Sequence, residues 1–387
     1  VGSEMCIRDR FKNPSGALAV GGHAFDSGRG VLYAQVPEAV SNGQTPAGAE
    51  TGPVLAIVEA DNLAVRERLK LPENLAGKAV LARDRSVLYA LSASGLMFLP
   101  VGALNQARRV VTLQEDVLLR GSLCERGVVT QEIDVVDPGG GATDFRLSTS
   151  MEGVTIEPAL GVTPAKVRVS VDMNQFQNLR GTTAGLLQIQ SATAVNVPSP
   201  VRVLVNNREP DQRGAVVNLP GKLVDIVADP FRDRFYVLRQ DTNQVLVFRS
   251  SDYQQIGTLR TGNTPTQMAL TFDGDYLLVA NDDSQVITVL DLRRMQAAAP
   301  VVMPPGHYAR SIATSANAIL VASRVVGPAH TIDRVNLFTR RATTLPSLGV
   351  WENKIHLNTV LVGTPSGAAI LAAMADGQVF LYSAFAD

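Results

Sequence analysis

The stretch GNTPTQMALTFDGDYLLVANDDSQVITVLD (residues 262–291) determines the fold. It contains three short apolar runs rich in Leu, Val and Ile, separated by turns that contain Asp, Gly, Asn and Ser. Short apolar runs between such turns are typical of antiparallel strands. No helical apolar period extends over about 12 residues. The stretch therefore predicts three consecutive β-strands joined by tight turns.

The same pattern recurs along the chain at a nearly constant interval. Residues 225–248, DIVADPFRDRFYVLRQDTNQVLVF, align with residues 267–290, and Ile226, Met268 and Ile312 occupy the same position at steps of 42 and 44 residues. Four short strands in about 40–45 residues are the repeat of a propeller blade. Further copies are FDSGRGVLYAQV (25–36), ARDRSVLYALSASGLMFL (82–99) and PSGAAILAAMADGQVFLY (365–382).

These repeats predict an all-β fold built around a β-propeller of about six blades, in a complete or an incomplete ring. A blade left alone exposes a sheet edge, and radial stacking of blades protects that edge. The six blade-like units that we expect span residues 16–71, 72–110, 216–259, 260–302, 303–346 and 347–387.

Residues 262–291 resemble the YVTN-type bacterial β-propellers, which share their fold with lactonase-like and quinoprotein-like propellers. The sequence LVAN (278–281) stands where the family has Tyr-Val-Thr-Asn, and only this copy keeps the Asn. The other copies have FYVLRQ, ILVASR, VLYALS and AILAAM at this place. The resemblance implies the fold, but the family includes both enzymes and non-enzymes.

Residues 111–207 interrupt the repeat and alternate between apolar and polar residues, as in AKVRVSV (165–171). Alternating strands about 8–12 residues apart predict a β-sandwich. The run IEPALGVTPAKVRVSVD, then Gly181, then GLLQIQSATAVNVPSPVRVLV resembles the Ig-like BACON module, for which carbohydrate binding has been proposed. The segment has no Trp or Tyr and only Phe145 and Phe176 as aromatic residues. The resemblance makes carbohydrate a candidate ligand, but the shortage of aromatic side chains favours a role as a spacer or partner-docking module.

The expected domains are propeller blades 1 and 2 at residues 11–110, the Ig-like sandwich at 111–207, and propeller blades 3 to 6 at 208–387. The sandwich is either inserted between two blades of one ring or placed between two propellers, and we favour one ring because two blades alone cannot bury their faces. Residues 1–10, VGSEMCIRDR, match one reading frame of a transposon sequencing adapter, so we exclude them from the native protein. We expect the native sequence to begin near Phe11 and to be cut upstream, so a signal peptide would be missing.

Composition argues against several classes of partner. The chain has 35 basic and 36 acidic residues, a net charge of −1, and its Arg residues are scattered, so we expect no nucleic-acid binding. We also expect no membrane span in this sequence. Cys6 lies in the adapter-like segment, which leaves Cys124 without a partner for a disulfide or a Cys metal cluster.

The sequence contains no motif with an established catalytic mechanism. It has neither a Gly-x-Ser-x-Gly nucleophile turn nor a P-loop. NDDS (281–284) lacks the spacing of a calcium loop and is explained by a turn between two strands. We therefore expect no cofactor and no intrinsic metal.

The loop that enters each innermost strand of a propeller lines one mouth of the central channel. Asn263 lies in such a loop, and the repeat offsets place His307, His356 and Glu73 at equivalent positions, with Arg310 three residues after His307. These groups can ligate a metal, bind an anion or transfer protons, although a wet channel mouth is polar without any function. The candidate catalytic residues are His307, His356, Glu73 and Arg310, and the candidate ligand-binding residues are these four and Asn263.

We expect a non-catalytic, extracytoplasmic binding or scaffold protein, periplasmic or secreted as the family resemblance implies. Its propeller would present a docking face for an unknown protein or small-molecule ligand, beside the Ig-like module. The alternative is a lactonase-like hydrolase at the channel mouth, with a His as base and Arg310 on the developing oxyanion. A quinoprotein-like redox propeller is less well supported, because its cofactor is held by stacked aromatic side chains and Trp351 is the only Trp.

Overall fold

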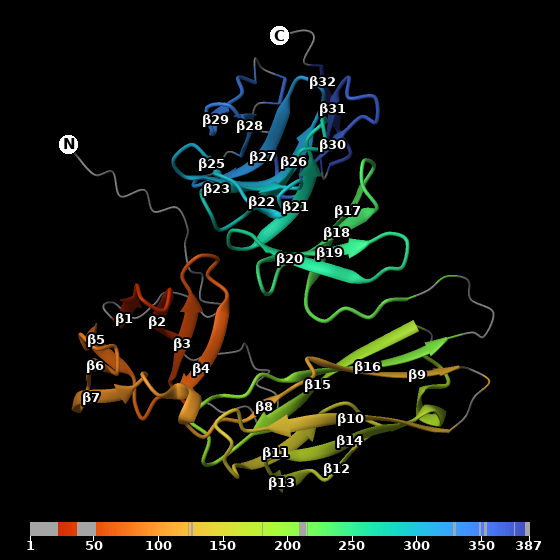
Figure 1. The fold of residues 1–387 in the computed structure, drawn as a ribbon. Coiled ribbons are helices and arrows are strands. Elements are labelled where there is room, and N and C mark those ends of the chain that lie inside the picture. Colours follow the sequence, from red (N-terminus) through yellow and green to blue (C-terminus); the bar gives the residue numbers. More distant parts are fainter. Residues whose placement is uncertain are drawn as a thin grey trace. The chain divides into compact units, whose positions relative to one another are not determined.

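The computed structural model describes residues 22–36, 52–122, 124, 127–179, 181–208, 214, 216–327, 330–347, 350–351, 354–374 and 376–383 (Figure 1). The adapter-like residues 1–10 lie outside these ranges. Strands dominate the described part, which includes two short 3-10 helices, and no helix in it is long and apolar enough to cross a membrane. The prediction of an all-β fold that combines a propeller with a sandwich is confirmed.

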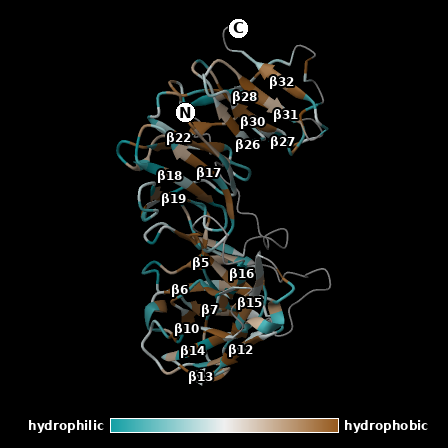
Figure 2. Ribbon diagram, turned by 90° about the vertical axis from the view of Figure 1, so that its right-hand side faces the viewer, coloured by the Kyte–Doolittle hydropathy of each residue, from teal (hydrophilic) through white to brown (hydrophobic). Residues whose placement is uncertain are grey.

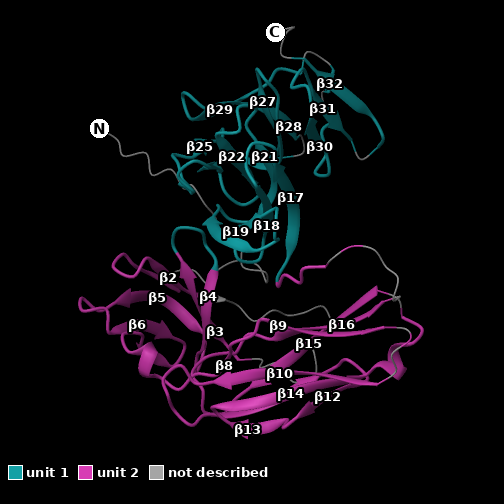
Figure 3. Cartoon of the chain, turned by 45° about the vertical axis from the view of Figure 1, so that its right-hand side comes forward, with its two compact units in different colours: residues 1–12, 60–64, 221–387 teal, residues 13–59, 65–220 magenta. Residues whose placement is uncertain are grey.

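The chain divides into two compact units (Figure 3). The first contains residues 13–59 and 65–220, and we call it the sandwich unit. The second contains residues 1–12, 60–64 and 221–387, and we call it the four-blade unit. In both units the hydrophobic residues follow the strands and the hydrophilic residues gather in the turns (Figure 2).

The sandwich unit begins with two antiparallel, blade-like sheets. The first has four strands and the second has three, so the second is one strand short of the predicted repeat. The missing strand has a local cause, because the chain after the third strand turns through a 3-10 helix (Leu104–Gln106) and continues into the sandwich. The strands are β1 (His23–Asp26), β2 (Val31–Val36), β3 (Val54–Glu59), β4 (Val65–Lys70), β5 (Leu75–Leu81), β6 (Val87–Ser92) and β7 (Gly95–Pro100).

Two sheets of the sandwich share one apolar core. Val167, Val169 and Val171 are fully buried on one face of their strand, whereas Lys166 and Arg168 are exposed on the other, as the alternation predicts. The sheet orders are β12-β14-β10-β8 and β13-β11-β15-β16-β9. The strands are β8 (Val111–Thr112), β9 (Asp116–Ser122), β10 (Val128–Val136), β11 (Asp144–Thr149), β12 (Val154–Glu157), β13 (Leu160–Val162), β14 (Ala165–Asp172), β15 (Gly181–Gln190) and β16 (Val201–Arg208).

The four-blade unit contains four successive antiparallel groups of strands. A parallel pairing of Val302 with Arg341 joins the second and third groups into one curled sheet. The strands are β17 (Leu223–Asp229), β18 (Arg234–Arg239), β19 (Gln244–Arg249), β20 (Gln255–Arg260), β21 (Pro265–Leu270), β22 (Tyr276–Asn281), β23 (Val286–Asp291), β24 (Gln296–Ala297), β25 (Val301–Val302), β26 (His307–Thr314), β27 (Ile319–Val325), β28 (Thr331–Asn336), β29 (Arg341–Thr344), β30 (Val360–Gly363), β31 (Ile370–Ala373) and β32 (Val379–Tyr382).

The innermost strands β17, β21, β26 and β30 lie side by side in sequence order. A β-bulge near the start of β17, β21 and β26 re-aims a polar side chain, as bulges commonly do. Side-chain oxygens at equivalent positions then link each innermost strand to the next one. The backbone N–H of Met268 donates to Asp225 Oδ2 (2.6 Å), that of Ile312 to Gln267 Oε1 (3.0 Å) and that of Leu361 to Ser311 Oγ (2.8 Å).

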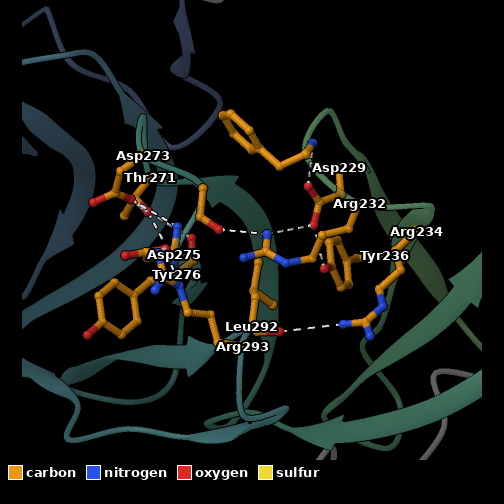
Figure 4. Close-up of polar contacts among 12 residues, drawn as sticks. Asp229, Arg232, Arg234, Tyr236, Thr271, Asp273, Asp275, Tyr276, Leu292 and Arg293 are labelled. Carbon is orange, nitrogen blue, oxygen red and sulfur yellow. Dashed lines mark hydrogen bonds and ion pairs between the residues drawn. The ribbon is translucent and has the colours of Figure 1, made fainter.

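A buried Asp-Arg-Tyr motif links the first two blades of the four-blade unit (Figure 4). The Asp229 carboxylate accepts hydrogen bonds from the Tyr236 hydroxyl (2.9 Å) and from Arg232 Nη1 (3.1 Å). Arg232 Nη1 also donates to the carbonyl oxygen of Gly274 in the next blade (2.8 Å). Burial and the neighbouring Asp229 carboxylate raise the pKa of the Tyr236 hydroxyl, which keeps it a hydrogen-bond donor.

The same motif recurs in the sandwich unit with the same spacing. Asp26, Arg29 and Tyr33 correspond to the residues of the first motif, and Asp26 and Tyr33 are both buried. Arg29 Nη1 donates to Asp26 Oδ2 (2.8 Å) and to the carbonyl oxygen of Arg85 in the next blade (2.8 Å). The motif is therefore a repeated element that fixes one blade against its neighbour.

Asp144, the first residue of β11, closes a turn of the sandwich. Its carboxylate accepts hydrogen bonds from the backbone N–H groups of Ala192 (2.8 Å) and Thr193 (3.1 Å) and from the hydroxyls of Ser191 (3.2 Å) and Thr193. These bonds, with the Thr193 hydroxyl contributing most, lower the pKa of Asp144 to about 2.

We expect this carboxylate to give a pH-dependent stabilisation. Because its folded pKa is depressed below 3.8, the stabilisation is complete above that pH and is lost as the pH falls toward about 2. Asp144→Asn should therefore lower the melting temperature at about pH 6, and the difference from the native chain should shrink below about pH 4. Calorimetry across this range tests it, with Glu152→Gln as an exposed control. A difference independent of pH would contradict the assignment.

Candidate functional site

Glu73 belongs to the sandwich unit, unlike the other four candidate residues. It lies between β4 and β5, just before an innermost strand, as the repeat offset predicts. The hydroxyls of Ser92 and Ser94 donate to its carboxylate and lower the pKa of Glu73. Its partners are therefore residues of its own blade.

Asn263, His307, Arg310 and His356 belong to the four-blade unit and lie where innermost strands begin. Asn263 precedes β21, His307 and Arg310 lie in the first half of β26, and His356 precedes β30. Because β21, β26 and β30 are neighbours, these four residues lie toward the same ends of adjacent strands.

Asn263 is buried and is part of the framework. Its backbone N–H donates to Ser284 Oγ (2.7 Å), and its side-chain oxygen accepts a hydrogen bond from Asn243 Nδ2 (3.3 Å). Ser284 belongs to the NDDS turn that follows β22, so Asn263 fastens one loop to another. These contacts explain why an Asn occupies this position, and the explanation requires no ligand.

His307 forms a pair with a fully buried carboxylate. Its Nδ1 lies 2.9 Å from Asp333 Oδ2 and 3.1 Å from Oδ1. Asp333 comes from β28 and has no exposed surface, whereas the His307 side chain retains 14%. With Nδ1–H donating to the carboxylate, Nε2 of a neutral imidazole is left as a proton acceptor. Among the candidate residues, this His–Asp pair has the clearest capacity for proton transfer.

Arg310 is engaged by the protein itself. Its Nη1 donates to Asp282 Oδ2 (2.6 Å), while Arg324 Nε donates to Asp282 Oδ1 (2.7 Å). Arg324 also donates to Asp283 (3.2 Å), and its guanidinium lies 4.4 Å from the centre of the Tyr308 ring. Two buried carboxylates of the NDDS turn thus balance two guanidinium groups, and an anion at Arg310 would compete with Asp282.

The sequence assigned no role to His330, but the structure places it in this charged region. Its Nδ1 accepts a hydrogen bond from the Val325 backbone N–H (3.3 Å). Burial, followed by the positive charges of Arg310 and Arg324, lowers the pKa of His330 and favours the neutral ring. Within the described ranges, no group of three or more His, Cys, Asp or Glu residues is arranged to hold a metal ion.

A cavity of about 360 Å³ lies at the opposite ends of the same innermost strands. Its walls are residues 267–272 from β21 and the following turn, 312–314 from β26 and 361–365 from β30 and the following turn. Pro230 and Phe231 complete the wall from the first blade. The cavity therefore lies where the strands end, whereas the residues selected from the sequence lie where they begin.

Two aromatic side chains in the wall of this cavity are exposed. Phe231 and Phe272 expose 60% and 52% of their surface. Both rings lie against a glycine with φ near +71°, where a Cβ would come within 2.2 Å of Phe231 and 2.3 Å of Phe272. Gly274 and Gly367 thus let each ring approach the backbone of another blade. The sequence feature that could have indicated these two residues is a Phe within an otherwise polar turn.

The fold defines an all-β protein of the propeller class with an added sandwich. No protein-family model matches the sequence, and no curated protein matches it. Among solved structures, the chain is similar to Kuenenia stuttgartiensis hydrazine synthase at 18% identity, over 49% of this chain and 49% of that chain, with a TM-score of 0.33. It thus spans about half the length of that chain. A similarity of this size supports no inference about function, so the fold assignment rests on the sheets described above.

Proposed function

We propose that the protein is a non-catalytic, extracytoplasmic binding or scaffold protein whose propeller part docks a protein or small-molecule ligand. The observation that supports this most is the 360 Å³ cavity with two exposed phenylalanines in its wall. Exposed aromatic rings beside a hollow are typical anchors of binding sites. The proposed docking face comprises this cavity together with Phe231 and Phe272.

The pairing of the charged groups at the other strand ends supports the non-catalytic part of the proposal. Arg310 and Arg324 are balanced by Asp282 and Asp283, and Asn263 is held by Ser284 and Asn243. Groups held in this way stabilise the blades and are not free to bind a substrate. We retain the YVTN-type and BACON-like assignments as part of this proposal, with the resemblances quoted above as their support.

The docking face can be tested without knowledge of the natural partner. Peptides selected from a random display library against the full chain should include a class whose binding depends on this cavity. Phe231→Ala and Phe272→Ala should each weaken that class about fivefold or more, because loss of an aromatic anchor typically costs over about 1 kcal/mol. Phe338→Ala is the matched control, since Phe338 is 96% exposed and does not line the cavity. Equal losses in all three variants would contradict the proposal.

A lactonase-like hydrolase is the second candidate, and the His307–Asp333 pair favours it. Nε2 of His307 would act as the base on an attacking water. The binding proposal predicts that the native chain and His307→Ala hydrolyse simple γ- and δ-lactones at the same background rate. A rate above background that falls about 100-fold or more in His307→Ala, the usual scale of general-base catalysis, would favour the hydrolase instead.

A further inference from the structure

Another cavity, of about 270 Å³, lies within the sandwich unit, and we call it the arginine pocket. Three arginines from separate segments line it: Arg29 between β1 and β2, Arg66 in β4 and Arg109 just before β8. All three side chains retain exposed surface, from 16% for Arg109 to 62% for Arg66. Another part of the wall is apolar and includes Ile57, Val101 and Leu104.

Arg66 and Glu67 are neighbours in β4, yet both line the pocket. In a regular strand, successive side chains point to opposite faces. Here Ile57 of β3 pairs with Glu67, and the next residue, Val58, pairs with Val65. Arg66 is therefore the extra residue of a β-bulge, and bulges re-aim side chains and are common beside functional sites. The bulge explains how one strand brings a cation and an acid to the same cavity.

The three arginines differ in how firmly acids of the protein hold them. Arg29 belongs to the Asp-Arg-Tyr motif, so a buried carboxylate balances it, and Arg109 Nη1 donates to both carboxylate oxygens of Glu67 (3.1 and 3.2 Å). Arg66 Nη1 lies 3.9 Å from Glu59 Oε1, which is beyond hydrogen-bond distance. An exposed ion pair of this kind contributes little. The pocket therefore contains one guanidinium that can pair with a further anion.

We propose that the arginine pocket binds a small monocarboxylate with an apolar body, whose carboxylate pairs with Arg66. A planar guanidinium offers parallel N–H donors to the two oxygens of a carboxylate, which favours this anion. The apolar body lies against Ile57 and Leu104. Because an apolar cavity of about 150 Å³ accommodates benzene, about 270 Å³ has room for a phenyl ring with a short carboxylate chain. The proposal does not rest on the docking face, which belongs to the four-blade unit.

The probe 3-phenylpropanoate has this size and charge, and 3-phenylpropan-1-ol is its uncharged counterpart. In ligand-detected NMR with the full chain at about pH 7, the acid should bind saturably and about tenfold or more tightly than the alcohol, because only the acid forms charge-assisted hydrogen bonds. Absence of saturable acid binding, or equal affinities for the two compounds, would overturn the proposal.

A charge-removing variant tests the role of Arg66. Arg66→Gln should weaken the acid about tenfold and leave the alcohol unchanged, a difference that a purely structural role of Arg66 would not produce. Arg83→Gln is the matched control, because Arg83 is exposed in the same unit and does not line the pocket. Equal acid affinities in Arg66→Gln and the native chain would exclude the proposed contact.

Glu67→Gln tests the same proposal in the opposite direction. It removes the negative charge that holds Arg109, so the acid should bind about threefold or more tightly, while the alcohol is unaffected. Unchanged or weaker acid binding in folded Glu67→Gln would count against the proposal. If Glu67→Gln does not fold, Arg66→Gln, which changes an exposed side chain, still decides the question.

Discussion

Asp229→Ala is expected to lower the free energy of unfolding of the four-blade unit by about 3–4 kcal/mol. The Asp229 side chain has no exposed surface and accepts hydrogen bonds from Tyr236, Arg232 and the backbone N–H of Phe231. Alanine would leave the fully buried Tyr236 hydroxyl without its acceptor and a partly buried guanidinium without its counter-charge. Removing one partner of a buried pair costs far more than an exposed ion pair contributes.

Urea unfolding followed by Trp351 fluorescence measures this effect, because the only Trp lies in the four-blade unit. Asp252→Ala is the matched control, since Asp252 pairs with Arg249 at an exposed site and its loss should lower the free energy of unfolding far less. Similar losses for the two variants would show that the Asp-Arg-Tyr motif does not stabilise the blades as we infer.

Asp282→Ala is the second large effect that we expect, at about 2–3 kcal/mol. Asp282 is the shared acceptor of Arg310 and Arg324, so its removal leaves two guanidinium groups with one buried carboxylate, Asp283. The expected loss is below that of Asp229→Ala because the Asp282 side chain is 11% exposed, whereas the Asp229 side chain has no exposed surface.

A double variant tests whether the cost arises from unbalanced charge. Adding Arg310→Ala to Asp282→Ala should restore part of the lost stability in urea unfolding, because one uncompensated guanidinium is removed. Arg293→Ala is the control, because it removes an exposed Arg of the same unit that pairs with Asp275. Strictly additive losses for Asp282→Ala and Arg310→Ala would contradict the charge-balance account.

The repeat pattern predicted the architecture because strand and turn chemistry are local. The alternation in residues 165–171 placed Val on the buried face, and the apolar runs of residues 262–291 became β21, β22 and β23. Asn281 is fully buried, and its Nδ2 donates to the Val286 carbonyl oxygen (2.9 Å) across the β22–β23 hairpin. Such short-range features can be inferred from sequence.

The contacts of the candidate site could not be predicted in the same way. Asp282 meets Arg324 across 42 residues, and His307 meets Asp333 across 26, so sequence spacing gave no sign of either pair. The repeat offsets located His307 and Arg310 at the starts of strands but could not show that Arg310 is paired. Phe231 resembled an ordinary turn residue, because its exposure depends on how the blades are arranged.

The central claim is that ligands dock at the ends of the innermost strands and not at their starts. Hydrogen–deuterium exchange of the full chain, with and without a peptide selected for binding, tests this most directly. We predict slower exchange in residues 267–272, 312–314 and 361–365, whose backbone lines the cavity. Slower exchange confined to residues 281–285 and 303–308, around Asp282 and His307, would contradict the claim and place the site at the other ends of the strands.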